Sequence, residues 1–257
     1  MDAVEIYRIV DGLVPKAISD EYCAVYGAYD NSGLLLNVGR EVKAIVFSLD
    51  LSKGAIALAK EKGANLIVTH HPAIYGKLSS LSVEQPVERK LLECAREEIS
   101  VISMHLNLDC AEGGIDDSLV DAFGGKTLRV MEKLTKGGYG KLSAVEKQPF
   151  EAFVRSLNAT LETDRTVTYG KRDVSLVASF CGAGVSEGAL SFAKENGADT
   201  VLSSDWKHHL IALCQDYGMN AVCITHYASE SYGFRKFVNK CQAALPAPCF
   251  LHEDGLK

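Results

Sequence analysis

The sequence has no run of apolar residues long enough to cross a bilayer, which argues against a membrane-spanning helix. It also has no excess of basic residues. The net charge is −6, so there is no electrostatic case for a nucleic-acid partner. The first fifteen residues, MDAVEIYRIVDGLVP, contain acidic residues and lack the basic start of a signal peptide. We therefore expect a cytoplasmic protein.

A CxxC pair is absent as well, although the chain has eight cysteines. Most of these cysteines lie inside apolar, periodic segments, which is typical of buried, reduced thiols rather than of a disulfide framework. The same setting argues against a zinc–thiolate site. The sequence therefore predicts eight free cysteines.

What the sequence does contain is a regular alternation of short apolar runs and amphipathic segments. Strands are predicted over 43–50, 65–70 and 100–109, and helices over 52–64 and 86–99. Strands that alternate with helices of this length are typical of βαβ units. The predicted fold class is therefore α/β, with mostly parallel sheets that bind ligands beyond the carboxyl ends of their strands.

The second half of the chain repeats this order. Residues 52–71 (SKGAIALAKEKGANLIVTHH) align without a gap on residues 186–205 (SEGALSFAKENGADTVLSSD). We predict two similar α/β domains, residues 1–125 and 126–257, related by a pseudo-twofold axis with a cleft between them. The last helix, from Glu230 to about residue 245, is expected to pack back on the first half. The first copy is longer by a loop that starts directly after Pro72.

Polar side chains gather where the predicted strands end. Imidazoles favour Zn, Fe, Ni or Cu, whereas carboxylates favour harder ions such as Mn and Mg. Adjacent His70 and His71 point in different directions from an extended backbone, so each is able to serve a different ion. A pair of metals uses this many ligands more naturally than a single ion. The candidate residues are His70, His71, His105, Asp109, His226 and Glu230.

A glycine-rich segment, CGAGVSEG at 181–188, has two interpretations. It resembles a phosphate cradle at the start of a helix. It lacks the Lys-Ser/Thr pair of a P-loop, so a tight turn between strand and helix is favoured.

Five segments together resemble the GTP cyclohydrolase 1 type 2 homologue family, also called YbgI-like or Ngg-interacting-factor-like proteins. These segments are YDNSGLLLNVG, LIVTHHPAIYGKLSSL, HLNLDCAEGGIDDSL, SSDWKHH and THYASE. The resemblance covers nearly the whole chain. It implies a dinuclear site whose ions are Zn, Fe, Mn, Ni or Mg, two α/β domains and a toroidal homohexamer. The implied metal ligands are His70, His71, Asp109, His226 and Glu230.

This chain departs from the family pattern at a few positions beside those ligands. Leu106 replaces a hydroxyl residue, Thr225 replaces a glycine, and Ser203-Ser204 stand where the family often has TG. None of these changes removes an implied ligand.

Two classes of function fit these residues. The favoured one is a metal-dependent hydrolase, and the family name suggests ring opening of GTP at C8 of the guanine with release of formate. Glu112, His105 and His209 are the candidates for proton transfer in that reaction. The alternative is a non-enzymatic metal-binding scaffold or metal-trafficking protein, which needs the same ligands.

Overall fold

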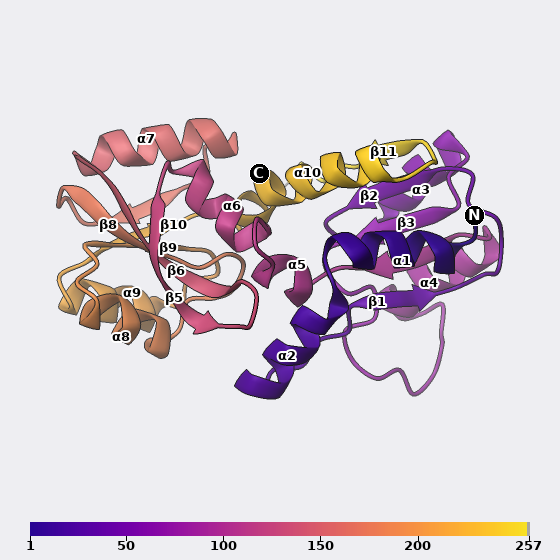
Figure 1. Ribbon diagram of the computed structural model, residues 1–257, viewed down its shortest axis with the longest axis horizontal. Helices are drawn as coiled ribbons and strands as arrows, with labels where there is room; N and C mark the ends of the chain where they lie inside the picture. The colour runs from indigo at the N-terminus through magenta and orange to yellow at the C-terminus, as the bar shows by residue number, and fades with distance from the viewer. Residues whose placement is uncertain (256–257) are drawn as a thin grey trace. The chain divides into compact units, whose positions relative to one another are not determined.

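The computed structural model describes residues 1–255, which form an α/β fold with two sheets (Figure 1). The contacts between residues divide the chain into two units, one of residues 1–108 and 235–255 and one of residues 109–234. The chain passes from one unit to the other inside α5 (Leu106–Cys110) and α10 (His226–Ala244). No helix in this part of the chain is long and apolar enough to cross a membrane. The predicted α/β fold class is confirmed.

The structure divides the chain at Asp109 rather than near residue 125. Residues 109–125 belong to the second unit because α6 (Ile115–Ala122) packs against β6 (Gly138–Gln148). Residues 235–255 belong to the first unit, where β11 (Cys249–Leu251) adds a strand beside β2 (Ile45–Ser48). The last part of the C-terminal helix thus belongs to the first unit.

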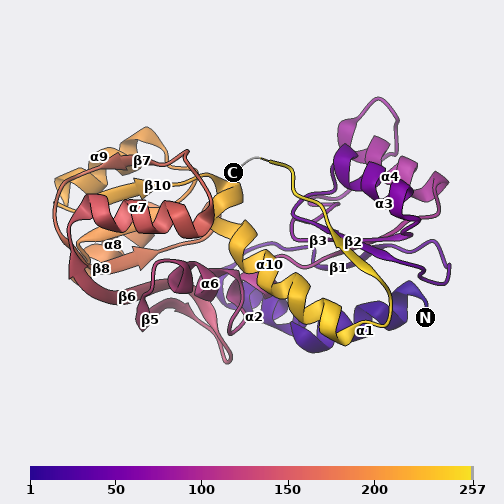
Figure 2. The ribbon, with the colours of Figure 1, turned by 90° about the horizontal axis from the view of Figure 1, so that it is seen from above.

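The first unit is a five-stranded sheet with helices on both faces. Its strand order is β1-β4-β3-β2-β11, and only β1, at one edge, runs antiparallel to its neighbour. Helices α3 and α4 cover one face, while α1 and the later part of α10 cover the other (Figure 2). The remaining elements are β1 (Gly33–Leu36), β3 (Leu66–Thr69), β4 (Ser100–Ser103), α1 (Ala3–Leu13), α2 (Lys16–Tyr26), α3 (Lys53–Lys62) and α4 (Pro86–Arg96).

The second unit has a six-stranded sheet of mixed direction. Its order is β5-β6-β8-β9-β10-β7, in which β8, β9 and β10 are parallel and the other pairs are antiparallel. Helices α8 and α9 pack on one face of this sheet, and α6 and α7 pack on the other (Figure 1). The elements are β5 (Lys126–Lys133), β7 (Val167–Tyr169), β8 (Val174–Ser179), β9 (Thr200–Ser203), β10 (Asn220–Cys223), α7 (Phe150–Leu161), α8 (Glu187–Glu195) and α9 (His208–Asp216).

The two units share the duplicated core that the sequence predicts. Strands β2-β3-β4 and β8-β9-β10 have the same order and direction, and each third strand has an antiparallel neighbour. The first helix of each copy starts at a serine N-cap. Ser52 accepts a hydrogen bond from the backbone of Ala55, and Ser186 accepts one from Ala189. A serine that satisfies a free N–H in this way sets where a helix begins.

The copies differ most in the connection after their second strand. In the first unit this connection runs from residue 70 to residue 85, whereas in the second it runs only from 204 to 207. The third strands have the same length, but the histidine that follows differs by one position, because His105 follows Ser100 by five positions and His226 follows Asn220 by six. The long connection of the first unit is the loop predicted after Pro72.

All eight cysteines are free thiols, which confirms the prediction from their sequence context. Burial raises the pKa of Cys94, Cys214 and Cys241 to about 12, so these thiols stay protonated at neutral pH. They act as small apolar residues of the core rather than as nucleophiles.

Candidate metal centre

Three histidines of the first unit lie together at the carboxyl ends of neighbouring parallel strands. His70 and His71 directly follow β3, and His105 follows β4. The ring centroid of His70 lies 4.9 Å from that of His71 and 5.3 Å from that of His105, and the His71 and His105 centroids are 5.9 Å apart. Parallel strands deliver their exits to one edge of the sheet, so residues far apart in the sequence form one imidazole cluster.

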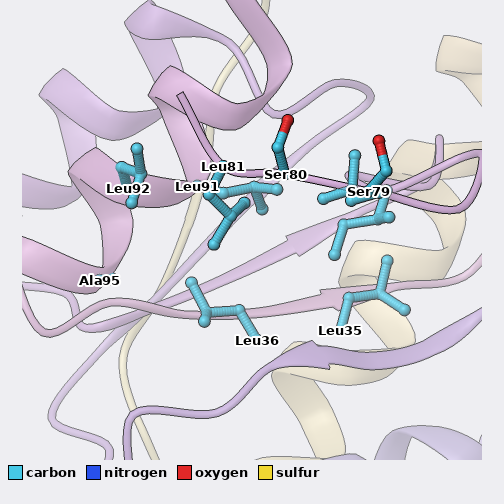
Figure 3. Close-up of a pocket in the computed structure, with 10 residues that line it drawn as sticks. Leu35, Leu36, Ser79, Ser80, Leu81, Leu91, Leu92 and Ala95 are labelled. Atoms are coloured by element: carbon cyan, nitrogen blue, oxygen red, sulfur yellow. The ribbon is translucent and has the colours of Figure 1, made fainter. Parts of the chain in front are cut away.

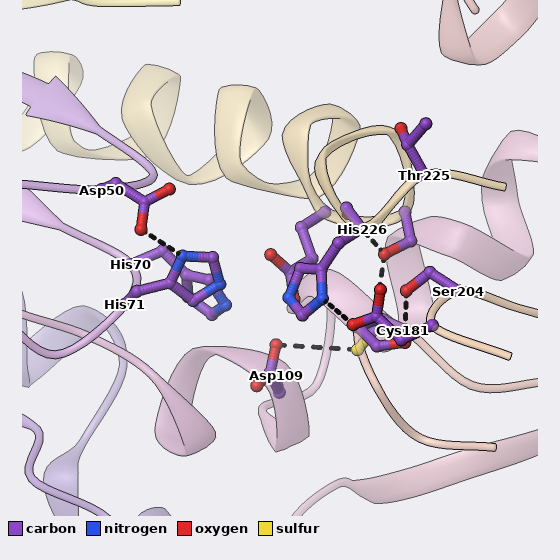
Figure 4. Close-up of polar contacts among 12 residues, drawn as sticks. Asp50, His70, His71, Asp109, Cys181, Ser204, Thr225 and His226 are labelled. Atoms are coloured by element: carbon purple, nitrogen blue, oxygen red, sulfur yellow. Dashed lines mark hydrogen bonds and ion pairs between the residues drawn. The ribbon is translucent and has the colours of Figure 1, made fainter. Parts of the chain in front are cut away.

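Each of these three rings is held through its Nδ1 atom. His70 Nδ1 donates to the backbone carbonyl of Met104 over 2.8 Å. His71 Nδ1 lies 3.0 Å from Asp50 Oδ1 (Figure 4), and His105 Nδ1 lies 2.8 Å from Asp30 Oδ1. Carbonyl and carboxylate oxygens accept hydrogen bonds, so the proton of each neutral ring is on Nδ1 and Nε2 is the basic nitrogen. Histidines that bind metals in proteins are held in this way.

The hydrogen bonds to Asp30 keep its carboxylate ionised beside His105. Its side chain is only 1% exposed and accepts hydrogen bonds from His105, from Ser19 over 2.5 Å and from Ser32 over 2.6 Å. Burial alone would raise the pKa of Asp30, but these hydrogen bonds outweigh it and hold the pKa well below its ordinary value. A buried negative charge therefore orients the His105 ring.

The second unit contributes a histidine and a carboxylate from one turn of α10. His226 begins the helix and Glu230 follows four residues later, so the two side chains lie on the same face. His226 Nε2 is 2.9 Å from Glu230 Oε1, and His226 Nδ1 is 2.6 Å from Asp205 Oδ2. Two ligands of a single cation at ordinary bond lengths are about 3 Å apart, so this pair fits one ion. Glu230 is almost completely buried.

A tight turn after β8 brings the backbone and a thiol to these carboxylates. Cys181 Sγ donates to Asp109 Oδ1 over 3.6 Å (Figure 4), and both side chains are buried. Gly182 has a φ of +54°, and a Cβ atom there would lie only 2.7 Å from Glu230 Oε1. Any larger residue would displace the carboxylate. The CGAG segment is thus a tight turn, as favoured from its sequence.

The departures from the family pattern have structural roles in the second unit. Thr225 Oγ1 accepts a hydrogen bond from the backbone of Ala228 and so caps the start of α10. Ser204 Oγ donates to the Gly182 carbonyl over 2.5 Å and fixes the turn (Figure 4). Both residues therefore support candidate ligands without replacing any of them.

The predicted site residues fall into two groups. Groupings of His, Asp and Glu that could hold a metal ion occur among the described residues. His70, His71 and His105 lie together in the first unit, and His226 lies beside Glu230 in the second, where Asp109 contacts Cys181. Glu112 and His209 take no part in such a grouping within residues 1–255, and both are exposed, Glu112 in the loop after α5 and His209 in the first turn of α9. A proton-transfer role for these two residues stays a prediction.

Four residues of the site were not singled out from the sequence: Asp30, Asp50, Cys181 and Asp205. Each aspartate holds one imidazole through Nδ1. The sequence does offer an indication for Asp50 and Asp205, because each lies just beyond the end of a buried strand. Asp30 lies in the YDNSG segment, whose partner His105 is 75 residues away. Sequence spacing does not indicate that contact.

An apolar pocket of the first unit is a separate feature (Figure 3). It has a volume of about 480 Å³, and its wall is made by β1, α4 and the loop after Pro72. None of its ten lining residues is ionisable, so it offers no metal ligand. These residues are Leu35, Leu36, Ile74, Leu78, Ser79, Ser80, Leu81, Leu91, Leu92 and Ala95.

Fold and site together define a two-unit α/β protein with buried His, Asp and Glu groupings able to bind metal. The chain belongs to the Duf34/NIF3 (NGG1p interacting factor 3) family, whose model matches residues 1–252.

Several relatives carry a common name. A GTP cyclohydrolase 1 type 2 homolog from Methanocaldococcus jannaschii is 29% identical over 241 residues, which is 92% of this chain and 93% of the relative. A homolog of the same name from Clostridium perfringens is 26% identical and covers 88% of this chain and 86% of its own length.

Solved structures show the same fold. Reduced HcgD from Methanocaldococcus jannaschii superposes with a TM-score of 0.82 at 25% identity, covering 98% of this chain and 97% of that one. A hypothetical protein from Staphylococcus aureus gives a TM-score of 0.85 at 20% identity, covering 100% of this chain and 99% of the other.

Proposed function

We propose that this protein is a metal-dependent hydrolase in which two divalent ions are held by His70, His71, Asp109, His226 and Glu230. The observation that carries the proposal is the way in which the four imidazole rings are held. Each has its Nδ1 engaged by a carboxylate or a carbonyl inside its own unit, which is how histidines that bind metals are oriented in proteins. The relatives named GTP cyclohydrolase 1 type 2 homolog support hydrolytic chemistry on a purine nucleotide.

The donor set fits divalent ions of intermediate hardness. It combines neutral imidazoles with carboxylates, a mixture that suits Zn, Fe, Mn or Ni better than Ca. When bound, such ions would activate water and stabilise negative charge on the attacked group. The charged Asp30 holds His105 through its Nδ1, and this ring accepts or delivers the proton that the reaction moves.

The roles of the two supporting aspartates can be separated by matched amide substitutions. Asp30→Asn should lower kcat by about 100-fold or more at unchanged metal content, because His105 loses the charge that orients it and supports its protonated form. Asp50→Asn should instead weaken metal binding by about 10- to 100-fold, because its partner His71 is a proposed ligand. Metal content and steady-state rates with GTP measure both effects.

Another imidazole–carboxylate pair, outside the proposed site, supplies the control. His252 Nε2 lies 2.9 Å from Asp254 Oδ1 in the C-terminal segment. Asp254→Asn should change neither metal content nor rate. If Asp30→Asn behaves like this control, His105 does not transfer the proton.

A non-enzymatic metal-binding protein would use the same ligands, so activity has to decide between the two. The metal-loaded protein should release formate, phosphate or another hydrolysis product from at least one nucleotide, at a rate that falls when the metal is removed. Metal binding without any such release would favour the scaffold. The free thiols agree with the cytoplasmic location that we propose.

For the assembly, we propose the toroidal homohexamer that the family resemblance implies. Light scattering at micromolar concentration should therefore give a mass near six subunits. A monomer that keeps its metal would show that the site is complete without the ring.

A further inference from the structure

Two tyrosines of the first unit expose their rings to solvent beside His105. Tyr29 is 49% exposed and Tyr75 is 58% exposed. Their ring centroids are 5.8 Å apart with an interplanar angle of 79°, which is an edge-to-face contact. Tyr75 makes a second contact of this kind with His105, at 6.4 Å and 80°. Three rings from three separate segments of the chain thus form one continuous aromatic group.

Both tyrosines are attached to residues that are held in place. Tyr29 directly precedes Asp30, whose buried carboxylate binds His105 and two serines. Tyr75 follows Ile74, whose carbonyl accepts a hydrogen bond from Asn31 Nδ2 over 2.6 Å. The side chain of Ile74 also lines the apolar pocket, and this contact holds the loop in a second way. The rings are therefore presented by a fixed backbone.

We propose that Tyr29 and Tyr75 bind a planar heteroaromatic ring of the substrate, such as a purine base, next to His105. An edge-to-face pair leaves ring faces open, and an aromatic face stacks on any nucleobase. The tyrosines adjoin the one imidazole of the cluster that is not a proposed metal ligand. A base stacked there would place its reacting carbon near the group that moves protons. This inference rests on the proposed hydrolase and assigns its substrate recognition.

The test uses the metal-loaded full chain and measures binding of GTP and ATP by calorimetry, with ribose 5-phosphate as a probe that has no base. Tyr75→Ala should weaken nucleotide binding by about 5- to 100-fold, the range expected for loss of one stacked base. Tyr75→Phe keeps the ring and should bind within about twofold of the parent. Metal content, and binding of ribose 5-phosphate, should stay unchanged. Tyr169→Ala removes another exposed tyrosine, on β7, and should have no effect.

Several results would overturn the inference. One is a parent protein that binds no nucleotide, and another is a Tyr75→Ala variant that binds nucleotide as tightly as the parent. A lower oligomeric mass in Tyr75→Ala is the third, because it would mean that a second copy covers the rings. The hydrolase proposal fails separately. Binding that depends on Tyr75 without any hydrolysis would support the aromatic site and contradict the enzyme. Hydrolysis of GTP by a Tyr75→Ala variant that binds GTP as tightly as the parent would support the enzyme and contradict the aromatic site.

Discussion

Glu230→Gln should lower the amount of metal bound per subunit while the protein stays folded. The amide keeps the shape of the carboxylate but loses its charge and one acceptor oxygen, so it is a poor ligand for a divalent ion. Glu230 is 2% exposed and lies 2.9 Å from His226 Nε2, which places its charge against a proposed ligand of the same ion. Elemental analysis after dialysis against dilute metal measures the loss.

His70→Ala should have the same effect on metal content, with an added cost in stability. His70 is completely buried, so alanine leaves a cavity, and we expect a loss of about 1–3 kcal/mol. The complete burial of this ring shows that it packs in the folded unit. Circular dichroism is therefore needed to show that the variant is folded before its metal is counted.

The matched control is a histidine outside the site. His208→Ala changes an exposed imidazole in the first turn of α9 and should bind as much metal as the parent. If Glu230→Gln and His70→Ala also bind as much as the parent, these residues are not ligands. The hydrolase proposal would then fall with them.

The duplicated core could be predicted because its signals are local. Buried four-residue strands, serine N-caps at Ser52 and Ser186, and glycine after the helix all act within a few residues. β11 could not be predicted in this way. Its three residues, Cys249–Leu251, carry no alternating pattern and become a strand only because α10 returns the chain beside β2. The division at Asp109 likewise depends on packing of α6 against β6.

The candidate ligands could be predicted, but the groups that orient them could not. A histidine after a buried strand is visible in the sequence, since the strand and the direction of its exit follow from local pattern. The contact of Asp30 with His105 depends on side-chain conformations and on two segments that meet only in the folded unit. The same is true of Cys181 and Asp109.

A buried ion pair in the second unit leads to the other large prediction. Lys141 on β6 is 2% exposed, and its Nζ lies 3.0 Å from Asp117 Oδ1 and 3.8 Å from Asp116 Oδ2. Asp116 is completely buried and accepts hydrogen bonds from the backbone of Gly140 and Cys181. Burial raises the pKa of Asp116 to about 7, although the Lys141 charge opposes the shift. Asp116 is therefore protonated at pH 5 and largely ionised at pH 8.

Lys141→Met should destabilise the second unit, and more strongly at pH 8 than at pH 5. A carboxyl whose pKa is raised on folding favours the folded state below its unfolded pKa, and this contribution is lost as the pH rises through about 7. Without Lys141 the ionised carboxylate has no cation, and we expect a loss of about 3–5 kcal/mol at pH 8. At pH 5 the neutral acid needs no cation, so the loss should be smaller by at least about 1 kcal/mol.

Urea unfolding followed by the fluorescence of Trp206 measures this effect in the second unit, where Lys141 lies. Trp206 is the single tryptophan of the chain and packs against the core of the second unit. The matched control is Lys147→Met, on the same strand, whose ion pair with Asp173 is 3.6 Å long and exposed. Exposed ion pairs contribute little to stability, so the free energy of unfolding of this variant should stay within about 0.5 kcal/mol of the parent at both pH values. The loss of Lys141 is costly only when Asp116 is ionised. If Lys141→Met lowers the free energy of unfolding equally at pH 5 and pH 8, Asp116 therefore keeps one protonation state across this range.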